Sequence, residues 1–266
     1  MKKAVRIFWR IFAGGFIAFT LMVILAIFGV FGKMPTLQEL ENPSMLQASE
    51  VYSEDGTLMG KYYTEKGNRS NVEFRDISKH VINALVATED ERFYSHSGVD
   101  FKSTMRAVLT AGTSGGGSTI TQQLAKALLD QGSKNKAWRV VEKLKEWIIA
   151  VKLEKNFTKE EIITLYLNAV PFGNNIYGIR NAARSFFQKE PDRLNVEEAA
   201  LLVGMLKGNS IYNPVRNPKA ALERRNIVLN QMEANKKITP AEAAKLKATP
   251  IKLNYKKLDE IGRAHV

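Results

Sequence analysis

The chain has 266 residues, 45% of them hydrophobic and 25% charged, and a net charge of +12. It contains no cysteine, which excludes a disulfide framework, thiolate metal centres and a cysteine nucleophile. Its three histidines are too few for a histidine-rich metal site.

The first element is an uncharged apolar segment, residues 11–31, which is long enough as a helix to cross the roughly 30 Å hydrocarbon core of a bilayer. Residues 1–10 before it are basic and carry no acidic side chain, so the positive-inside rule places them in the cytoplasm. A cleaved signal peptide is the alternative, but its apolar region would be about 7–15 residues long and a cleavage site would follow. We therefore predict an uncleaved transmembrane helix, followed by a juxtamembrane linker over residues 32–48.

The part of the chain beyond the anchor is also basic. Residues 1–33 carry five Lys or Arg side chains and no acidic one, which leaves a charge of +7 on the rest. A basic domain beside a membrane attracts anionic lipid headgroups or a phosphate-bearing substrate. Nucleic acid is not expected as a partner, because the anchor takes this domain out of the cytoplasm.

A small β element and then many helices are predicted next. Residues 51–63 alternate around the turn dipeptide Asp55-Gly56 and predict a β-hairpin. Apolar spacing predicts helices over 76–93, 101–111, 118–129 and 138–157, the last with the stripe Val140, Leu144, Trp147 and Val151. Three later helices start with capping boxes, which are Thr158 with Glu161, Asn195 with Glu198, and Thr239 with Glu242. The fold class is therefore mostly α.

Residues 260–266 (EIGRAHV) show no structural pattern and match one reading frame of a common sequencing adapter. We predict that they are an artefact and that residues 236–259 begin a linker to a further C-terminal domain. Re-sequencing the 3′ end of the gene and finding these codons followed by a stop would refute this.

An acidic cluster follows the apolar run 81–86. Glu89 lies one helical turn from Leu85 and from Phe93, so its surroundings are apolar, whereas Asp90 and Glu91 are expected to point elsewhere. A partly desolvated carboxylate suits general acid–base catalysis. The alternative is a solvated helix end, although acidic residues there oppose the helix dipole.

Two polar segments offer binding groups. A glycine loop leads into a helix that starts with Ser118 and Thr119, and free N–H groups at a helix N-terminus bind phosphate. A flexible loop before a polar helix is the alternative. His96 is expected to form hydrogen bonds beside the pocket. By spacing alone, Lys143 and Glu146 form a surface ion pair worth less than about 0.5 kcal/mol.

Five stretches, taken together and in this order, resemble the family 51 peptidoglycan glycosyltransferases, which form the transglycosylase domain of class A penicillin-binding proteins and the monofunctional transglycosylases. They are ATEDERFYSHSGVD (87–100), GGSTITQQLAK (116–126), EKLKEWIIAVKLEKNFTKEEIITLYLN (142–168), GIRNAARSFF (178–187) and AALLVGMLKGNSIYNPVRNP (199–218). The resemblance implies a lysozyme-like glycosyltransferase domain over 49–235, with a small membrane-embedded jaw lobe.

The same resemblance implies the reaction. Lipid II is polymerised into β-1,4-linked glycan strands, with inversion and release of undecaprenyl pyrophosphate. The implied location is the bacterial cytoplasmic (inner) membrane, crossed once, with the catalytic domain outside. The implied partners are lipid II, the undecaprenyl-pyrophosphate-linked glycan, the membrane and proteins of a cell-wall synthesis complex.

The resemblance also implies residue roles. Glu89 matches the catalytic general base and Glu146 a second glutamate of the site. The other matched residues bind substrate: Arg106 and Lys126 the donor phosphates, Ser118, Thr119 and Gln123 the donor site, and Phe93, His96 and Lys207 the cleft. No cofactor is obligatory; a divalent metal, Mg2+ or Mn2+, at Glu146 is an option. Glu142 and Ala127 depart from the family pattern, where Arg and Asn are frequent.

Two other functions are compatible with parts of the pattern. A lysozyme-like lytic enzyme would also use one glutamate in a helical cleft, acting as an acid. A non-catalytic scaffold of a cell-wall complex would need neither Glu89 nor Glu146.

Overall fold

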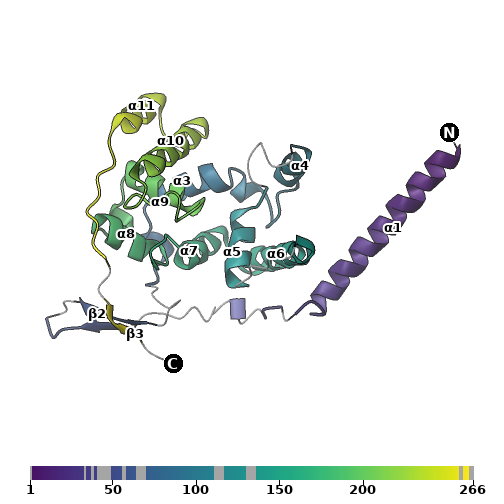
Figure 1. Ribbon diagram of the computed structural model, residues 1–266, viewed down its shortest axis with the longest axis horizontal. Coiled ribbons are helices and arrows are strands. Elements are labelled where there is room, and N and C mark those ends of the chain that lie inside the picture. Colours follow the sequence, from purple (N-terminus) through teal and green to yellow (C-terminus); the bar gives the residue numbers. More distant parts are fainter. Residues whose placement is uncertain are drawn as a thin grey trace.

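The computed structural model describes residues 2–32, 34–36, 39–40, 49–55, 58–63, 70–110, 117–129, 136–257 and 260–263. These residues are mostly helical, which confirms the predicted fold class, and Figure 1 shows their arrangement. The elements are α1 (Lys2–Ile27), β1 (Ser49–Tyr52), β2 (Leu58–Tyr63), η1 (Phe74–Asp76), α3 (Lys79–Glu89), η2 (Phe93–Ser95), α4 (Phe101–Leu109), α5 (Ile120–Leu128), α6 (Lys136–Asn156), α7 (Lys159–Ala169), α8 (Ile179–Phe187), η3 (Pro191–Arg193), α9 (Val196–Leu206), α10 (Pro218–Ala234), α11 (Pro240–Ala248) and β3 (Glu260–Arg263).

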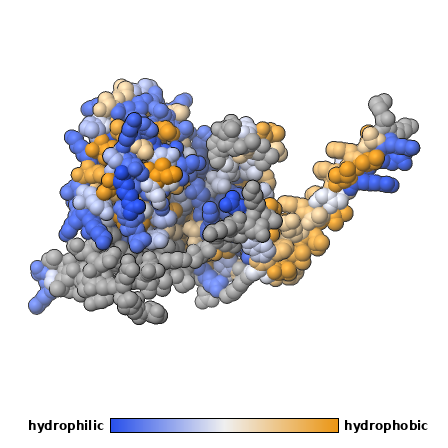
Figure 2. All heavy atoms as spheres, viewed as in Figure 1, coloured by the Kyte–Doolittle hydropathy of each residue, from blue (hydrophilic) through white to orange (hydrophobic). Residues whose placement is uncertain are grey.

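Helix α1 projects away from the helical body (Figure 1). Its residues Lys3–Ile27 are long and apolar enough to cross a membrane, with a mean hydropathy of 2.2 in the most apolar window. Figure 2 shows apolar side chains along much of α1 and hydrophilic ones near its N-terminal end. The helix ends four residues earlier than predicted, because Gly29 and Gly32 adopt positive φ angles and form turns there.

The core is built around α9, whose residues 199–205 are all buried. A helix that is apolar on every face needs cover on every side, and α10 and α3 pack against it. The three predicted capping boxes are confirmed at the starts of α7, α9 and α11.

The apolar stripe predicted along α6 is only partly correct. Leu144 is buried, but Val140 and Val151 are exposed. The face of α6 that packs on α5 and α7 is rotated from the predicted stripe and includes Ile149 and Leu153, both fully buried. Spacing located the helix, and tertiary packing selected its buried side.

The predicted hairpin is confirmed. Strands β1 and β2 pair antiparallel, with Ser49 opposite Tyr62, and Gly56 of the expected turn lies outside the described residues. Strand β3 adds to β2 in parallel, with Lys61 opposite Glu260. Residues 260–263 therefore have a place in the sheet, whereas the origin of their codons stays a prediction.

Residues 236–257, predicted as the start of a linker, pack on the domain. Helix α11 lies against α10, and the following extended segment, Thr249–Lys257, runs along α8. The backbone N–H of Asn254 donates to the carbonyl of Phe186 at 3.0 Å, and that of Lys256 to Ser185 at 2.9 Å. We call residues 249–257 the strap.

A buried arginine holds the strap in place. The guanidinium of Arg225, on α10, donates to the carbonyl oxygens of Leu246 (3.3 Å), Lys247 (3.4 Å) and Thr249 (2.7 Å). Its side chain is 1% exposed, and burial lowers the pKa of Arg225, an effect that the charge of Glu197 opposes. Arg225 thus caps the C-terminus of α11 from inside the protein.

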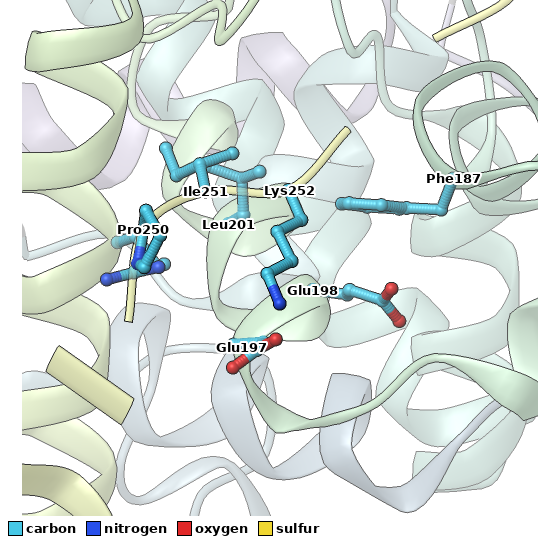
Figure 3. A pocket seen from close by; sticks show the side chains of 8 residues that line it. Phe187, Glu197, Glu198, Leu201, Pro250, Ile251 and Lys252 are labelled. Atoms are coloured by element: carbon cyan, nitrogen blue, oxygen red, sulfur yellow. The ribbon is translucent and has the colours of Figure 1, made fainter. Parts of the chain in front are cut away.

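A small cavity lies beside this arginine, where the strap crosses the first turns of α9 (Figure 3). Its volume is about 10 Å³, roughly the space of one water molecule. It is lined by Glu197 and Leu201 of α9 and by Pro250 and Ile251 of the strap. The cavity is a packing gap and is too small for an organic ligand.

Replacing Arg225 by Met should lower the free energy of unfolding by about 3 kcal/mol, because three part-buried carbonyl groups at the end of α11 lose the guanidinium as a donor. Chemical denaturation followed by circular dichroism measures this loss. Lys219→Met, at an exposed position of the same helix, is the control and should change stability little. Equal losses in the two variants would contradict the capping role of Arg225.

Candidate active site

The acidic cluster lies where α3 ends. Helix α3 begins after Ser78, whose hydroxyl accepts from the N–H of His80, and it ends at Glu89. The helix predicted over 76–93 was therefore too long at both ends. Phe93 lies in the separate turn η2, so it does not share a helical face with Glu89.

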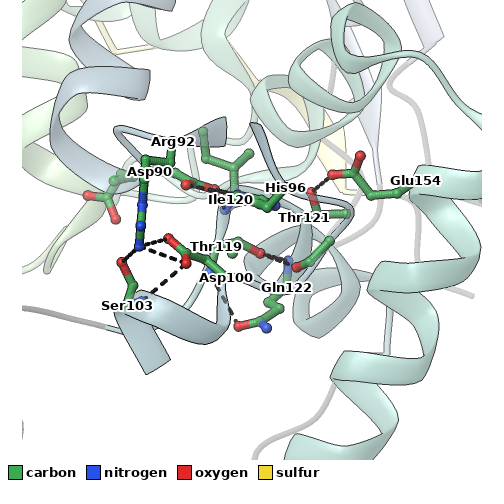
Figure 4. A network of polar contacts seen from close by, with 12 residues as sticks. Asp90, Arg92, His96, Asp100, Ser103, Thr119, Ile120, Thr121, Gln122 and Glu154 are labelled. Atoms are coloured by element: carbon green, nitrogen blue, oxygen red, sulfur yellow. Dashed lines mark hydrogen bonds and ion pairs between the residues drawn. The ribbon is translucent and has the colours of Figure 1, made fainter. Parts of the chain in front are cut away.

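Asp90 is the polar centre of this region (Figure 4). Its buried carboxylate lies 3.0 Å from Nε2 of His96 through both oxygens and accepts from the N–H of Ile120 at 3.0 Å. As expected, Asp90 points elsewhere than Glu89, and the two carboxylates have different partners. The hydrogen-bonding role predicted for His96 is confirmed, and Asp90 joins the ends of α3, η2 and α5.

At the N-terminus of α5, the backbone N–H groups of Ile120 and Gln122 already have acceptors within the protein. Thr119 accepts from the N–H of Gln122 at 3.1 Å and donates to the carbonyl of Gly98 at 2.6 Å, while Asp90 takes the N–H of Ile120. Gly98 permits this contact, because at its φ of +90° a Cβ atom would lie 2.7 Å from a carbonyl oxygen of α6. The expectation of free N–H groups for phosphate is therefore not met at Ile120 and Gln122.

Glu89 is half-buried and receives a hydrogen bond from a neutral side chain. Nε2 of Gln123, on α5, donates to Oε2 of Glu89 at 2.9 Å. The hydroxyl of Tyr166, on α7, donates to Oε1 of Gln123 at 2.9 Å. Burial raises the pKa of Tyr166 well above its ordinary value, and the charge of Glu89 adds to this rise.

Glu89 opens onto a pocket of about 240 Å³. Its walls come from the end of α3, the start of α4, the start of α5 and Gln231 of α10. Of the predicted site residues, this pocket brings together Glu89, Arg106, Ser118 and Thr119. It thus combines carboxylates, a guanidinium and hydroxyl groups, which can accept a proton and bind a negatively charged group.

The second glutamate adjoins the same wall. Glu146 is buried, and Nζ of Lys143 lies 2.7 Å from its Oε2 and 2.9 Å from the hydroxyl of Ser118. The interpretation of this pair as a surface ion pair was wrong, because α6 turns it inward toward α5. Lys143 connects Glu146 to a residue of the pocket.

The start of α4 is fixed by a second ion pair, also drawn in Figure 4. Arg92 donates to both oxygens of Asp100, at 2.7 and 2.6 Å, and to the hydroxyl of Ser103 at 3.0 Å. Burial by itself would raise the pKa of Asp100, but the hydrogen bonds from Ser103 and Arg92 together lower it. The guanidinium of Arg106 donates to the hydroxyl of the same Ser103 at 3.3 Å.

Six predicted site residues do not line the pocket: Gln123, Glu146 and His96, whose contacts are given above, and Phe93, Lys126 and Lys207. Phe93 is fully buried, with the ammonium of Lys159 4.3 Å from its ring centroid. Lys126 is exposed on α5, and Lys207 is exposed at the C-cap of α9. Their roles in substrate binding stay predictions.

The residues around Glu146 offer few ligands for the predicted divalent metal. Within the described ranges, no cluster of three His, Asp or Glu side chains could hold a metal ion. A cation at Glu146 would also have to displace the ammonium of Lys143. The protein residues around Glu146 therefore do not form a metal site by themselves, and a metal stays a prediction.

Sequence reasoning missed Asp100 and Tyr166 and undervalued Asp90 and Lys143. The signal for Asp100 was present, because an Asp just before a helix with Ser three residues later is a typical N-cap. The contact of Tyr166 spans 43 positions to Gln123, and no local pattern encodes it.

Comparison with known proteins decides the family. The family model described as Transglycosylase matches residues 55–233, about two thirds of the chain. The chain belongs to the transglycosylase family. The transglycosylase domain therefore includes α3 to α9 and most of α10, and all the residues of the pocket.

Several relatives contain a similar domain. Penicillin-binding protein 1A of Aquifex aeolicus is 40% identical over 217 residues, which cover 80% of this chain and 29% of that protein. Penicillin-binding protein 2a of Streptococcus pneumoniae is 38% identical over 215 residues, covering 80% and 28%. Penicillin-binding protein 1F of Bacillus subtilis is 38% identical over 217 residues, covering 80% and 30%. The chain spans less than a third of the length of these relatives.

Among solved structures, the chain is similar to penicillin-binding protein 1A from Haemophilus influenzae, with 24% identity and a TM-score of 0.44. The matched region covers 83% of this chain and 23% of that one.

Replacing Asp100 by Asn should destabilise the transglycosylase domain by about 1–3 kcal/mol at pH 7. A carboxyl with a lowered pKa stabilises the fold above its ordinary pKa, and this contribution disappears as the pH falls through the folded-state value. The unfolding free energy of the variant should therefore fall less between pH 5 and acidic pH than that of the wild type. Denaturant titrations across this range test it, with exposed Asp192→Asn as the control.

Proposed function

We propose that this chain is a peptidoglycan glycosyltransferase that polymerises lipid II. One observation carries the proposal: half-buried Glu89 faces a pocket that the cationic Arg106 also lines. Membership of the transglycosylase family and a helix able to cross a membrane support it. We place the chain in the bacterial cytoplasmic membrane, with the N-terminus inside and the catalytic domain outside.

In the proposed reaction Glu89 is the general base. It takes the proton of the acceptor 4-hydroxyl as that oxygen attacks C1 of the donor sugar, and the bond from C1 to the pyrophosphate breaks. Attack from the face opposite the α-linked pyrophosphate gives a β-1,4 bond and inverts C1. A carboxylate within reach of the hydroxyl supplies the base without a cofactor.

Negative charge grows on the leaving undecaprenyl pyrophosphate. Arg106 lines the pocket and Lys143 contacts its wall through Ser118, so both are suited to stabilise this charge. Lys126 would join them from the exposed side of α5. Glu146 holds Lys143 in position, and this assigns the second glutamate an electrostatic role.

The substrate's lipid tail requires a path into the bilayer. Helix α4 exposes three apolar side chains at successive turns, which are Phe101 (74% exposed), Met105 (60%) and Leu109 (78%). A contiguous exposed apolar stripe of this kind marks a contact surface. We propose that α4 inserts this stripe into the outer leaflet beside the pocket.

Glu89→Gln should abolish polymerisation of labelled lipid II by the detergent-solubilised protein, with a rate loss of at least about 10²-fold, because the amide cannot accept the proton. The product is measured as lysozyme-sensitive polymer on gels. Glu223→Gln, an exposed residue of α10, is the control and should retain the wild-type rate.

Other outcomes of the same assay identify the alternatives. A lytic enzyme would shorten preformed glycan and leave lipid II unused, and a scaffold would do neither. Wild-type polymerisation by a folded Glu89→Gln variant would show that another residue is the base.

The proposed contact of α4 with the membrane is testable because the chain has no cysteine. Met105→Cys, labelled with an environment-sensitive dye, should shift its emission to the blue in vesicles and be quenched by lipids brominated in their acyl chains. Lys219→Cys, labelled in the same way, should show neither effect. A water-exposed signal at both positions would contradict insertion of α4.

A further inference from the structure

Three helices meet at one amide next to the proposed base. Glu89 ends α3, Gln123 lies in α5 and Tyr166 in α7. The two hydrogen bonds, both 2.9 Å long, form a chain from the hydroxyl of Tyr166 through the amide of Gln123 to the carboxylate of Glu89. Tyr166 is 1% exposed and belongs to the hydrophobic core, so it does not reach the pocket itself.

The direction of this chain depends on the hydroxyl. The oxygen of the Gln123 amide accepts only, and its NH2 group donates only. While Tyr166 donates to the oxygen, the NH2 group faces Glu89, where it matches an ionised carboxylate. The reverse orientation would set two acceptors, the amide oxygen and the carboxylate, against each other.

Tyr166 is suited to be a lasting donor. Burial and the nearby charge of Glu89 both raise the pKa of its hydroxyl, so the hydroxyl keeps its proton throughout the range in which enzymes work. Its ring is fixed by the core, which holds the hydroxyl in one place.

We propose that Tyr166 is a positioning residue that orients the amide of Gln123 toward Glu89 and so holds the base in place and aimed at the pocket. This inference rests on the proposed role of Glu89 in lipid II polymerisation. It assigns a function to a core tyrosine that makes no contact with substrate.

The other charged groups near Glu89 are engaged elsewhere or are exposed. Asp90 is bound to His96, and Asp100 to Arg92. Glu91 and Arg106 line the pocket from exposed positions, where solvent screens them. Among the hydrogen bonds of the described residues, the one from Gln123 is the contact that fixes the carboxylate of Glu89.

A double-mutant cycle on the full-length protein tests the proposal. Tyr166→Phe and Gln123→Ala should each lower kcat/KM for lipid II by about tenfold, the range expected for losing a hydrogen bond to a charged group. The double variant should also be about tenfold slower, because each change removes the same chain of contacts. In Tyr166→Phe the loss should lie in kcat and not in KM, because the base is misaligned while the substrate contacts remain. Tyr255→Phe, which removes a hydroxyl far from the pocket, is the matched control.

A purely structural role for Tyr166 gives a different result. The two losses would then multiply to about a hundredfold in the double variant. The melting temperature of Tyr166→Phe would also fall, without a selective loss of kcat. Either result would overturn the proposal.

A second measurement does not depend on activity. The side-chain NH2 group of Gln123 is followed by ¹⁵N NMR, its signal being the one lost in Gln123→Ala. In Tyr166→Phe this signal should shift, and in Tyr255→Phe it should not. If the wild type makes no polymer, the proposed function fails, but this signal still decides whether Tyr166 orients the amide beside Glu89. An unchanged Gln123 signal in Tyr166→Phe would overturn the inference.

Discussion

The carboxylate of Asp90 is the interaction on which the site depends. It accepts a hydrogen bond from the N–H of Ile120, which has no acceptor within α5, and it also contacts His96. Asp90 therefore fixes the end of α3 against α5. Glu89 directly precedes Asp90 in the chain, and Gln123 lies three residues after Ile120, whose N–H Asp90 binds. The contact from Ile120 therefore helps to hold Gln123 close to Glu89. A buried carboxylate can take this role because both of its oxygens have hydrogen-bond partners.

The two glutamates of the site have different environments and therefore different properties. Glu89 receives a neutral amide donor and opens onto the pocket. Glu146 is buried, and its Oε2 lies 2.7 Å from the ammonium of Lys143. These contacts agree with the proposed roles, in which Glu89 is the base and Glu146 holds Lys143 in position.

Much of this could be predicted from the sequence. The apolar N-terminal helix, the hairpin and three capped helices follow from local patterns, because each depends on residues within a few positions of one another. The position of Glu89 after an apolar run, together with the family resemblance, pointed to it as the base, which stays a prediction. Its partners did not follow from local patterns: Gln123 and Tyr166 approach it across 34 and 77 positions of the sequence. The buried side of α6 and the engaged N-terminus of α5 were also missed, since tertiary packing decides both.

The buried guanidinium of Arg225 has a mechanical consequence. It ties the strap to α10, and Gln231, six residues further along that helix, forms part of the pocket wall. A helix is a stiff rod over such a distance, about 9 Å. Tension applied to the chain beyond the strap would therefore be carried by α10, the helix that borders the pocket. Arg225 and Gln231 would then move together as parts of one rigid helix.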